Sequence, residues 1–423
     1  MQAKKLMILG GNPETAALVR VANDMGVHTI VVDPIKQSPA KLVAKESYDI
    51  DALNVDALEE LALKIGIDGV LVGVADILVS SYYALCQRLD LPTYATTEAI
   101  EAFGSKDRFI KVCESFDIAT TPRFTEYDAL NDKILEKEYP ILVKPVDNGG
   151  GVGISICQSK RDLGTAIELG KYASKSKSIL IEKFMSCDDM AAYYSFVNGT
   201  PFLTATSDRY TSYKTYKGSP VCIGASYPSK HEEEFLSEVH PKLIQMFKSL
   251  NIKDGVLNIQ FFKDSEVFYA YDPGFRLQGE GFHIHLKSAF GFDQREELVN
   301  FSLNESLSSY YNLIQNKRMG DHFYAATVWI LLKPGTIRVI SGLNDIFQLP
   351  SYKDILSRFQ EGDTVDEQMV GTEKQVFCRI YLQHHNLNQI YVDIDKINAL
   401  LKIESKKSSL IFDSLKSNTL LNA

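Results

Sequence analysis

The chain of 423 residues has little of what several common protein classes require. Its six cysteines are dispersed and include no Cys-x-x-Cys pair, which argues against a disulfide framework or a zinc site and for reduced, buried thiols. No apolar run is long enough for a membrane-spanning helix, and the apolar segment at the N-terminus is too short for a signal peptide. We therefore expect a cytoplasmic protein without a membrane segment.

Positively charged residues are fewer than negatively charged ones. Lysine and arginine number 45 against 54 aspartates and glutamates, so the formal net charge is −9. Binding to a duplex backbone needs a surplus of positive charge, so we expect no nucleic-acid partner. With 45% hydrophobic and 23% charged residues, a chain of this length can bury large cores and is expected to form two or three domains.

Two common nucleotide-binding motifs are missing as well. No Gly-Lys-Ser/Thr follows a glycine-rich loop, which excludes a Walker loop. The Gly10-Gly11 turn, with Asp33 after the next strand, lacks the full Gly-x-Gly-x-x-Gly fingerprint of a dinucleotide site. We interpret these residues as a turn and a strand-end acid, at a sheet edge that can still contribute to a substrate pocket.

The most informative stretch that is present is YPILVKPVDNGGGVGIS, residues 139–155. Its short apolar run predicts a buried strand, and Lys144 stands at the end, where a long side chain can leave the sheet. The glycines that follow let backbone N–H groups approach a polyphosphate, because no side chain stands between them. The stretch predicts a loop that closes over a nucleotide; the alternative is a hairpin beside a solvated lysine. The glycines are Gly149, Gly150, Gly151 and Gly153.

Residues 1–95, before this stretch, alternate apolar strands with helices. This is the βαβ pattern of a three-layer α/β domain. After it, Ser105 is expected to cap a helix with Lys106 near its start, where a helix end attracts anions. Strands are expected at 6–9, 28–33, 47–50 and 68–73, and helices at 14–25, 56–65 and 76–89.

Residues 255–280, GVLNIQFFKDSEVFYAYDPGFRLQGE, predict a β-hairpin around a polar Lys-Asp-Ser-Glu turn. Asn258 and Gln260 interrupt the first strand, and Asp272 ends the second. Such oxygens suit Mg²⁺, which takes one or two protein oxygens plus substrate phosphates; the alternative is a hydrogen-bonded core amide and a turn-capping acid. Arg276 adds a forked donor for phosphate or carboxylate. Gln260 and Asp272 lie on the same face of the hairpin only if the connection has an odd number of residues or one strand contains a bulge.

The order VKP…GGGVGI, ILIEKF, NIQFF and YDPGFR resembles the ATP-grasp superfamily, most closely ligases related to the large subunit of carbamoyl phosphate synthetase. The resemblance spans residues 4–303. It implies an α/β fold, α+β in its central part, with the nucleotide clamped between two β-sheets. The implied parts are a pre-ATP-grasp βαβ domain (1–95), an ATP-grasp domain (96–310) with a lid subdomain at about 122–184, and a small C-terminal α/β subdomain (311–423).

The resemblance also implies roles for individual residues. Lys106 and Lys144 would contact the ATP phosphates below the glycine loop, and Lys144 and Arg276 would be catalytic. Gln260 and Asp272 would hold Mg²⁺ or Mn²⁺. The other nucleotide contacts would be Glu182, Lys183 and Phe184 at adenine and Asp189 at ribose, where the family carries a glutamate.

The sequence departs from the family at the metal site. The pattern Glu-x-Asn-x-Arg is replaced by DPGFR at 272–276, so Gly274 stands where an asparagine ligand is usual, and the bridging acid is one methylene shorter. Few protein ligands would remain, so we expect metal binding to depend on nucleotide. Gly274→Asn is expected to restore a ligand if the site has room.

The implied activity is that of an ATP- and Mg²⁺-dependent, ADP-forming ligase, which activates a small-molecule carboxylate as an acyl phosphate for attack by an amine. The partners would be these small molecules, and a homodimer is a possible assembly. Two alternatives stay open: ATP-dependent carboxylation of a substrate through carboxyphosphate, and a nucleotide-binding protein that has lost catalysis. Weaker candidates for substrate contacts are Tyr210, Lys214, His283 and His285, the two histidines alternating as on a strand.

Beyond residue 304 the resemblance weakens. We expect a β-hairpin around Pro334-Gly335, a strand at 375–383 and a helix that begins at Asp393. The polar end, 405–423, is expected to fray.

Overall fold

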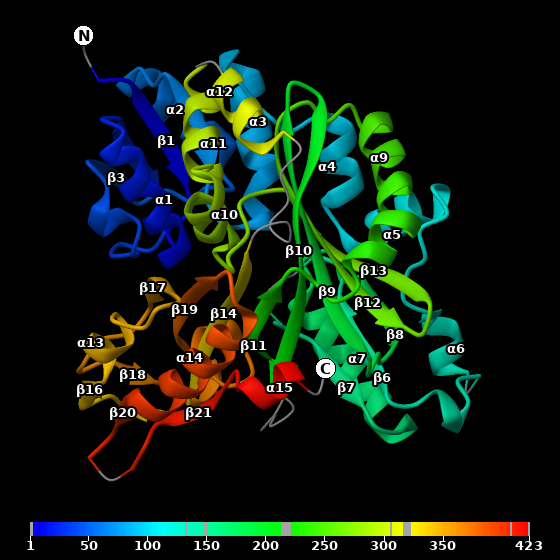
Figure 1. The fold of residues 1–423 in the computed structure, drawn as a ribbon. Coiled ribbons are helices and arrows are strands. Elements are labelled where there is room, and N and C mark those ends of the chain that lie inside the picture. Colours follow the sequence, from blue (N-terminus) through cyan, green and yellow to red (C-terminus); the bar gives the residue numbers. More distant parts are fainter. Residues whose placement is uncertain are drawn as a thin grey trace.

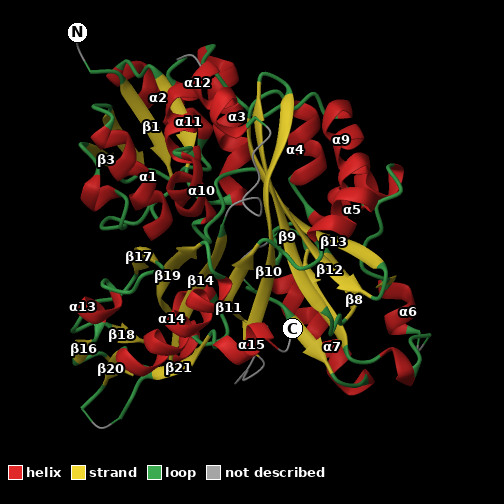
Figure 2. Ribbon diagram, viewed as in Figure 1, coloured by secondary structure: helices red, strands yellow, loops and turns green. Residues whose placement is uncertain are grey.

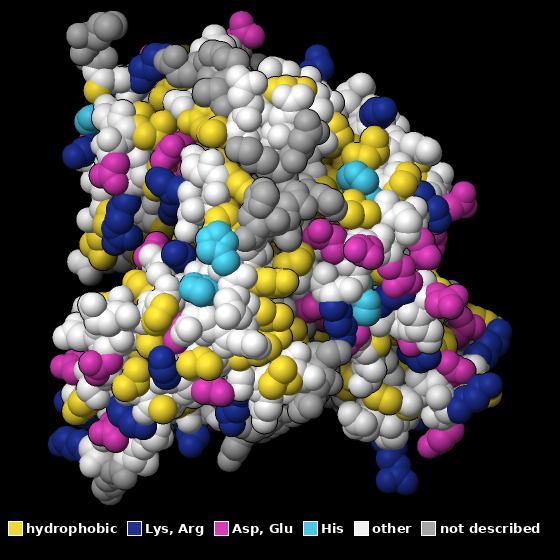
Figure 3. Space-filling model, viewed as in Figure 1, with side chains coloured by type: hydrophobic (Ala, Val, Ile, Leu, Met, Phe, Trp, Pro, Cys, Tyr) yellow, Lys and Arg dark blue, Asp and Glu magenta, His cyan; other side chains and the backbone are white. Residues whose placement is uncertain are grey.

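The computed structural model describes residues 3–131, 133–147, 151–212, 221–304, 307–315, 323–406 and 408–421 (Figure 1). Long strands run through the middle of the molecule, and helices surround them (Figure 2). Within the described ranges, no helix combines the length and the apolar character needed to cross a membrane. Basic and acidic side chains are interspersed over the face drawn in Figure 3.

The N-terminal part is a four-stranded parallel sheet in the order β3-β2-β1-β4. The first strand of this sheet is almost continuously apolar, and the last four residues of that strand are buried. This is typical of parallel strands covered by helices. The predicted βαβ pattern is confirmed. The elements are β1 (Lys5–Leu9), α1 (Pro13–Asp24), β2 (His28–Val32), β3 (Glu46–Tyr48), α2 (Val55–Ile65), β4 (Gly69–Val72) and α3 (Val79–Leu89).

The largest unit is a nine-stranded sheet in the order β13-β12-β9-β10-β11-β14-β19-β17, in which β21 also pairs with β14. All of its described pairs are antiparallel, and it continues without a break across the boundary expected at residue 310. Its strands are β9 (Asp188–Val197), β10 (Thr200–Ser212), β11 (Val221–Tyr227), β12 (Gly255–Asp264), β13 (Val267–Gly274), β14 (Tyr324–Leu332), β17 (Tyr352–Ser357), β19 (Val376–His384) and β21 (Ile411–Ser414).

Two expectations for the C-terminal part are wrong. No hairpin forms around Pro334-Gly335, because β14 pairs with β11, β19 and β21, while the short strands β15 (Gly335–Thr336) and β16 (Val339–Ser341) pair elsewhere. Residues 408–421, which were expected to fray, instead contain β21, paired with β14, and a short helix. The remaining elements here are β18 (Thr364–Val365), α13 (Leu343–Ile346), α14 (Leu387–Leu400), β20 (Lys402–Glu404) and α15 (Ser417–Leu421).

A separate four-stranded antiparallel sheet, in the order β5-β8-β6-β7, lies in the segment where a lid was expected and is called the lid below; it is seen at the lower right of Figure 1. Helix α7 packs on β6 and β7, and its residues Leu163, Ala166 and Ile167 bury an apolar face against this sheet. The buried strand predicted at Lys144 is confirmed as β6. The lid consists of β5 (Arg123–Phe124), α6 (Glu126–Leu130), β6 (Ile141–Pro145), β7 (Ser155–Cys157), α7 (Lys160–Ala173) and β8 (Ile179–Lys183).

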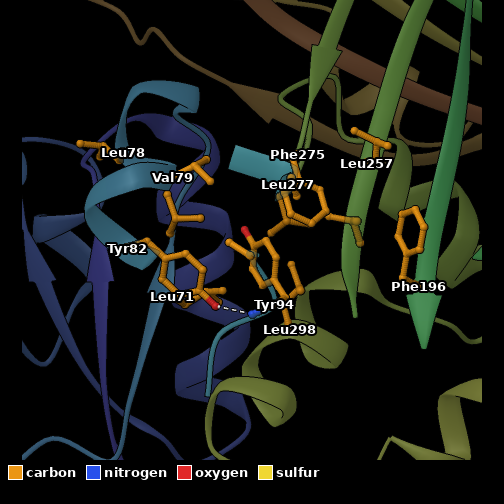
Figure 4. Close-up of a cluster of buried hydrophobic side chains, with 14 of the residues drawn as sticks. Leu71, Leu78, Val79, Tyr82, Tyr94, Phe196, Leu257, Phe275, Leu277 and Leu298 are labelled. Atoms are coloured by element: carbon orange, nitrogen blue, oxygen red, sulfur yellow. Dashed lines mark hydrogen bonds between the residues drawn. The ribbon is translucent and has the colours of Figure 1, made fainter. Parts of the chain in front are cut away.

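One continuous core joins the N-terminal sheet to the large sheet, with Tyr94 at its centre (Figure 4). The Tyr94 ring lies edge-on to Phe275 at 5.3 Å and packs on Tyr82 at 5.0 Å. A Cβ on Gly255 would lie 2.8 Å from the Tyr94 ring, so only glycine fits there. This core fixes the two sheets that border the site. The helices not yet named are α4 (Thr97–Phe103), α5 (Lys106–Ser115), α8 (Glu232–Glu238), α9 (His240–Ser249), α10 (Phe282–Phe290), α11 (Gln294–Ser302) and α12 (Ser308–Ile314).

Candidate active site

Two adjoining cavities meet where the lid, the nine-stranded sheet and the N-terminal part come together. The first cavity has a volume of about 450 Å³ and lies between the lid and the large sheet. The second, of about 760 Å³, lies between the large sheet and the N-terminal part. Their common wall consists of Lys106, Val152, Arg209, Gln260, Asp272, Thr372 and Glu373.

A buried ion pair stands on the lid side of the first cavity. Lys144 on β6 lies 2.6 Å from the Glu182 carboxylate on the neighbouring strand β8, and their side chains are only 6% and 3% exposed. The second carboxylate oxygen, Glu182 Oε1, is buried and has no hydrogen-bond partner among the described residues. The cavity wall therefore offers a cation beside an acceptor that still lacks a donor.

The predicted hairpin is confirmed, and it contains the bulge on which a shared metal site depends. Gln260 pairs directly with Asp272, whereas Phe261 pairs with Ala270, so Tyr271 is the extra residue. The two-residue loop alone would have placed Gln260 and Asp272 on opposite faces. The bulge puts both side chains on the face that lines the two cavities.

Asp272 is surrounded by positive charge. Its carboxylate lies 2.7 Å from Lys106 Nζ, at the first position of α5. Burial by itself raises the pKa of Asp272, but the charges of Lys106, Lys144 and Arg276 lower it below its usual value overall. Asp272 therefore stays ionised, and a negatively charged carboxylate is suited to bind a metal cation.

A buried network around Arg209 was missed by the sequence analysis. Arg209 donates to Asp189 (2.9 Å), Glu280 (2.8 Å) and the Tyr271 hydroxyl (2.9 Å), and more weakly to Gln260 Oε1 (3.3 Å). Burial raises the pKa of Asp189 to about 6, against the attraction of Arg209. The available signal was the pair of charged residues Asp208 and Arg209 inside a strand, directly before Tyr210.

Arg276 reaches from the end of the hairpin to the N-terminal part. Its Nη2 donates to Asp76 at 2.6 Å, and its Nη1 donates to the carbonyl of Leu277 at 3.0 Å. Burial lowers the pKa of Arg276, but the nearby charges of Asp76 and Asp272 raise it overall. Arg276 lines the second cavity and not the first.

The family model described as "D-ala D-ala ligase C-terminus" matches residues 115–269. Among solved structures, an L-amino acid ligase from Bacillus licheniformis superposes with a TM-score of 0.77 at 17% identity, covering 96% of this chain and all of that one. The phosphoribosylglycinamide synthetase from Anaerococcus prevotii gives 0.73 at 17% identity, with the same coverage. The chain therefore has the ATP-grasp fold.

Curated relatives match at lower coverage. The formate-dependent phosphoribosylglycinamide formyltransferase of Francisella tularensis subsp. tularensis is 29% identical over 195 residues, 44% of this chain and 49% of the relative. The enzyme of that name from Sulfurovum sp. is 25% identical over 316 residues, 68% of this chain and 77% of the relative. The match thus spans about half the length of the first of these relatives.

Most of the residues predicted for the ATP-grasp site line the cavities. Lys183 and Phe184 border the first cavity with Gly151, while Gly153 packs into the lid, where a Cβ would lie 2.5 Å from Ala173. Tyr210 also lines the first cavity. Gly149, Gly150 and Lys214 lie outside the described residues.

His283 and His285 are not brought to either cavity. The strand expected for them is wrong: both lie on helix α10, which begins after Gly281 at φ +81°, and both are buried. His285 packs against Tyr227 and Tyr381 and shares a hydrogen bond with Thr327. Two histidines with a single apolar residue, Ile284, between them fit a strand and a helix alike, so the local pattern does not decide between the two.

The buried histidines predict a loss of stability in acid. Burial lowers the pKa of both His283 and His285 to about 3, so they stay neutral in the folded protein while the unfolded chain takes up protons below its ordinary pKa, near 6.5. Each is expected to remove about 1.4 kcal/mol of unfolding free energy per pH unit below about 6. In denaturant titrations between pH 4.5 and 7, His285→Gln should lower this slope by about one proton. Equal slopes in the native protein and the variant would contradict the expectation.

Proposed function

We propose that this protein is an ATP-dependent, ADP-forming ligase that activates a small-molecule carboxylate as an acyl phosphate and joins it to an amine. One observation carries the proposal: Lys106, Gln260 and Asp272 stand in the common wall of two cavities, each large enough for a small molecule. A phosphoryl group that is transferred from a ligand in one cavity to a ligand in the other must pass this wall. Cationic side chains in the wall can neutralise its negative charge.

The first cavity is the proposed ATP site. Lys106 and Lys144 would meet the phosphates, and Glu182 Oε1, which lacks a donor among the described residues, suits the exocyclic amine of adenine. Lys183 and Phe184 would complete the adenine slot. Asp189 is held by Arg209 and Tyr271, so its role at the ribose would require it to share those donors.

The second cavity is the proposed site for the acid and the amine. Arg276 and Glu280 line it, together with Gln278, whose Nε2 is buried and has no partner among the residues that the structure describes. Orphan donors in a cavity wall are the groups that a polar substrate would satisfy. Ile100 and Phe103 from α4 add apolar surface to this lining, which also includes the charged residues Glu14, Asp76 and Arg358.

Mg²⁺ fits the hairpin face only if amide oxygens contribute. Among the described residues, no group of three or more His, Cys, Asp or Glu side chains is arranged to hold a metal ion. Gln260 and Asp272 would hold the ion, and ATP phosphates and water would complete its coordination. When bound, Mg²⁺ would neutralise phosphate charge, while Lys144 and Arg276 orient the groups that react.

We infer that residues 1–95 and 311–423 border the second cavity on either side, and that 96–310 carries most of the nucleotide site. All six cysteines, which lie in the described ranges, are free, which supports a reducing, cytoplasmic location.

A phosphate-release screen tests the proposal. The purified protein is incubated with ATP, Mg²⁺ and pairs drawn from amino acids, sugar acids and amines, with bicarbonate as a separate arm. Release that requires both an acid and an amine is the expected result. Release that requires bicarbonate would indicate carboxylation instead. Tight ATP binding without release in any arm would contradict both activities and favour a nucleotide-binding protein without catalysis.

A further inference from the structure

Residue 274, where an asparagine ligand is usual, is a glycine, and a side chain of the paired strand fills the space beside it. Gly274 on β13 pairs directly with Asn258 on β12. A Cβ built on Gly274 would lie 2.6 Å from Asn258 Oδ1 and 3.3 Å from Arg276 Nη1. The space that a side chain at residue 274 would enter therefore already holds the Asn258 carboxamide.

The Asn258 amide oxygen is an acceptor without a donor. Asn258 is 8% exposed, and its Oδ1 is buried with no hydrogen-bond partner among the described residues. Leaving a buried carboxamide oxygen unsatisfied costs about 1–3 kcal/mol, so such an atom at a cavity wall needs an explanation. Asn258 lines the second cavity beside Gln260 and Asp272.

The register places the three oxygen-bearing side chains on one face of the hairpin. Asn258 and Gln260 are two residues apart on β12, so they point to the same side of the sheet. Asp272 lies opposite Gln260 and shares that side. The face thus carries two amide oxygens and one carboxylate, all of them hard donors of the kind that Mg²⁺ prefers.

We propose that Asn258 replaces the absent asparagine at residue 274 as the third protein ligand of the metal site, with Gln260 and Asp272 as the other two. This inference rests on the proposed function, because the ion enters with the nucleotide. It explains why glycine stands at 274: the ligand has moved to the paired strand, and a side chain at 274 would collide with it. Gly274→Asn alone is therefore expected not to tighten Mg²⁺ binding, because its Cβ would have to displace the Asn258 side chain.

A reciprocal exchange tests the assignment. Mn²⁺ binding is measured by electron paramagnetic resonance in the presence of a non-hydrolysable ATP analogue, for the native protein and variants of residues 258 and 274. Loss of groups that only orient ligands weakens metal binding about 10- to 100-fold, so Asn258→Ala, which removes a ligand, should weaken Mn²⁺ binding at least about tenfold. Gly274→Asn should also bind poorly. The double variant Asn258→Ala/Gly274→Asn should recover most of the affinity, because the new side chain then has room.

Two further results decide the remaining cases. Asn258→Asp has nearly the same shape and adds a negative charge, so it should tighten Mn²⁺ even if Asn258→Ala folds poorly. Native affinity in both Asn258 variants would overturn the inference and leave the ligase proposal intact. Absence of nucleotide-dependent Mn²⁺ binding in the native protein would instead contradict the proposed function, and this inference with it.

Discussion

Lys144→Met is expected to lower turnover of the proposed ligase by two to three orders of magnitude and to weaken ATP binding. Lys144 stands at the wall of the first cavity, beside Tyr271 and close enough to Asp272 to lower its pKa. Losing one preorganised group that stabilises developing charge typically costs about 10²–10³ in rate. The measurements are ADP release at saturating substrates and ATP affinity by calorimetry.

The ion pair with Glu182 complicates this variant and supplies its control. Because both side chains are almost fully buried, removing Lys144 alone leaves an uncompensated carboxylate, at a cost of about 3–5 kcal/mol. Lys144→Met/Glu182→Gln removes both charges and should recover stability in thermal unfolding while activity stays low. If activity returns with stability, Lys144 acts through the fold and not on the phosphates.

The fold was predictable where neighbours in sequence are also neighbours in space. The βαβ pattern of residues 1–95 and the hairpin at 255–280 depend on local alternation and on short connections, and both are confirmed. The pairing of the C-terminal strands was not predictable, because β14 pairs with strands about 50 to 100 residues away in either direction. A Pro-Gly pair marks a turn but does not say which strands it joins.

The candidate site, like the fold, was predictable only where its residues lie close together in sequence. Lys106, Lys144, Gln260 and Asp272 lie in motifs short enough to be recognised, and all four line the first cavity. Their pairing was not predictable, since each lysine finds its acid on an element distant in sequence. The Arg209 network gathers residues from β9, β10 and β13 and from the segment after β13, so no single stretch shows it. The role of Asn258 depends on a register that only the structure gives.

Asp272→Asn is expected to abolish turnover while leaving adenine binding largely intact. Asp272 is the one carboxylate of the proposed metal set, and it stands among Lys106, Lys144 and Arg276. The asparagine keeps the shape but removes the charge that attracts the ion, so nucleotide-dependent Mn²⁺ binding should fall with activity, by roughly three orders of magnitude in rate. The first cavity then becomes more positive. Free ATP should therefore bind as well as before or more tightly, which separates loss of metal from loss of nucleotide.

The matched control for Asp272→Asn is Asp264→Asn, at the exposed tip of the same hairpin. It makes the same chemical change about 14 Å from the Gln260–Asp272 pair by strand rise, and it should alter neither Mn²⁺ binding nor turnover. The experiment compares both variants with the native protein in Mn²⁺ titrations, with and without the ATP analogue, and in ADP release. Full activity in Asp272→Asn, or Mn²⁺ binding that does not depend on nucleotide, would place the metal elsewhere. Loss of free-ATP binding together with activity would instead show that Asp272 holds Lys106 in position for the phosphates, since their ion pair at 2.7 Å is the contact that the variant weakens first.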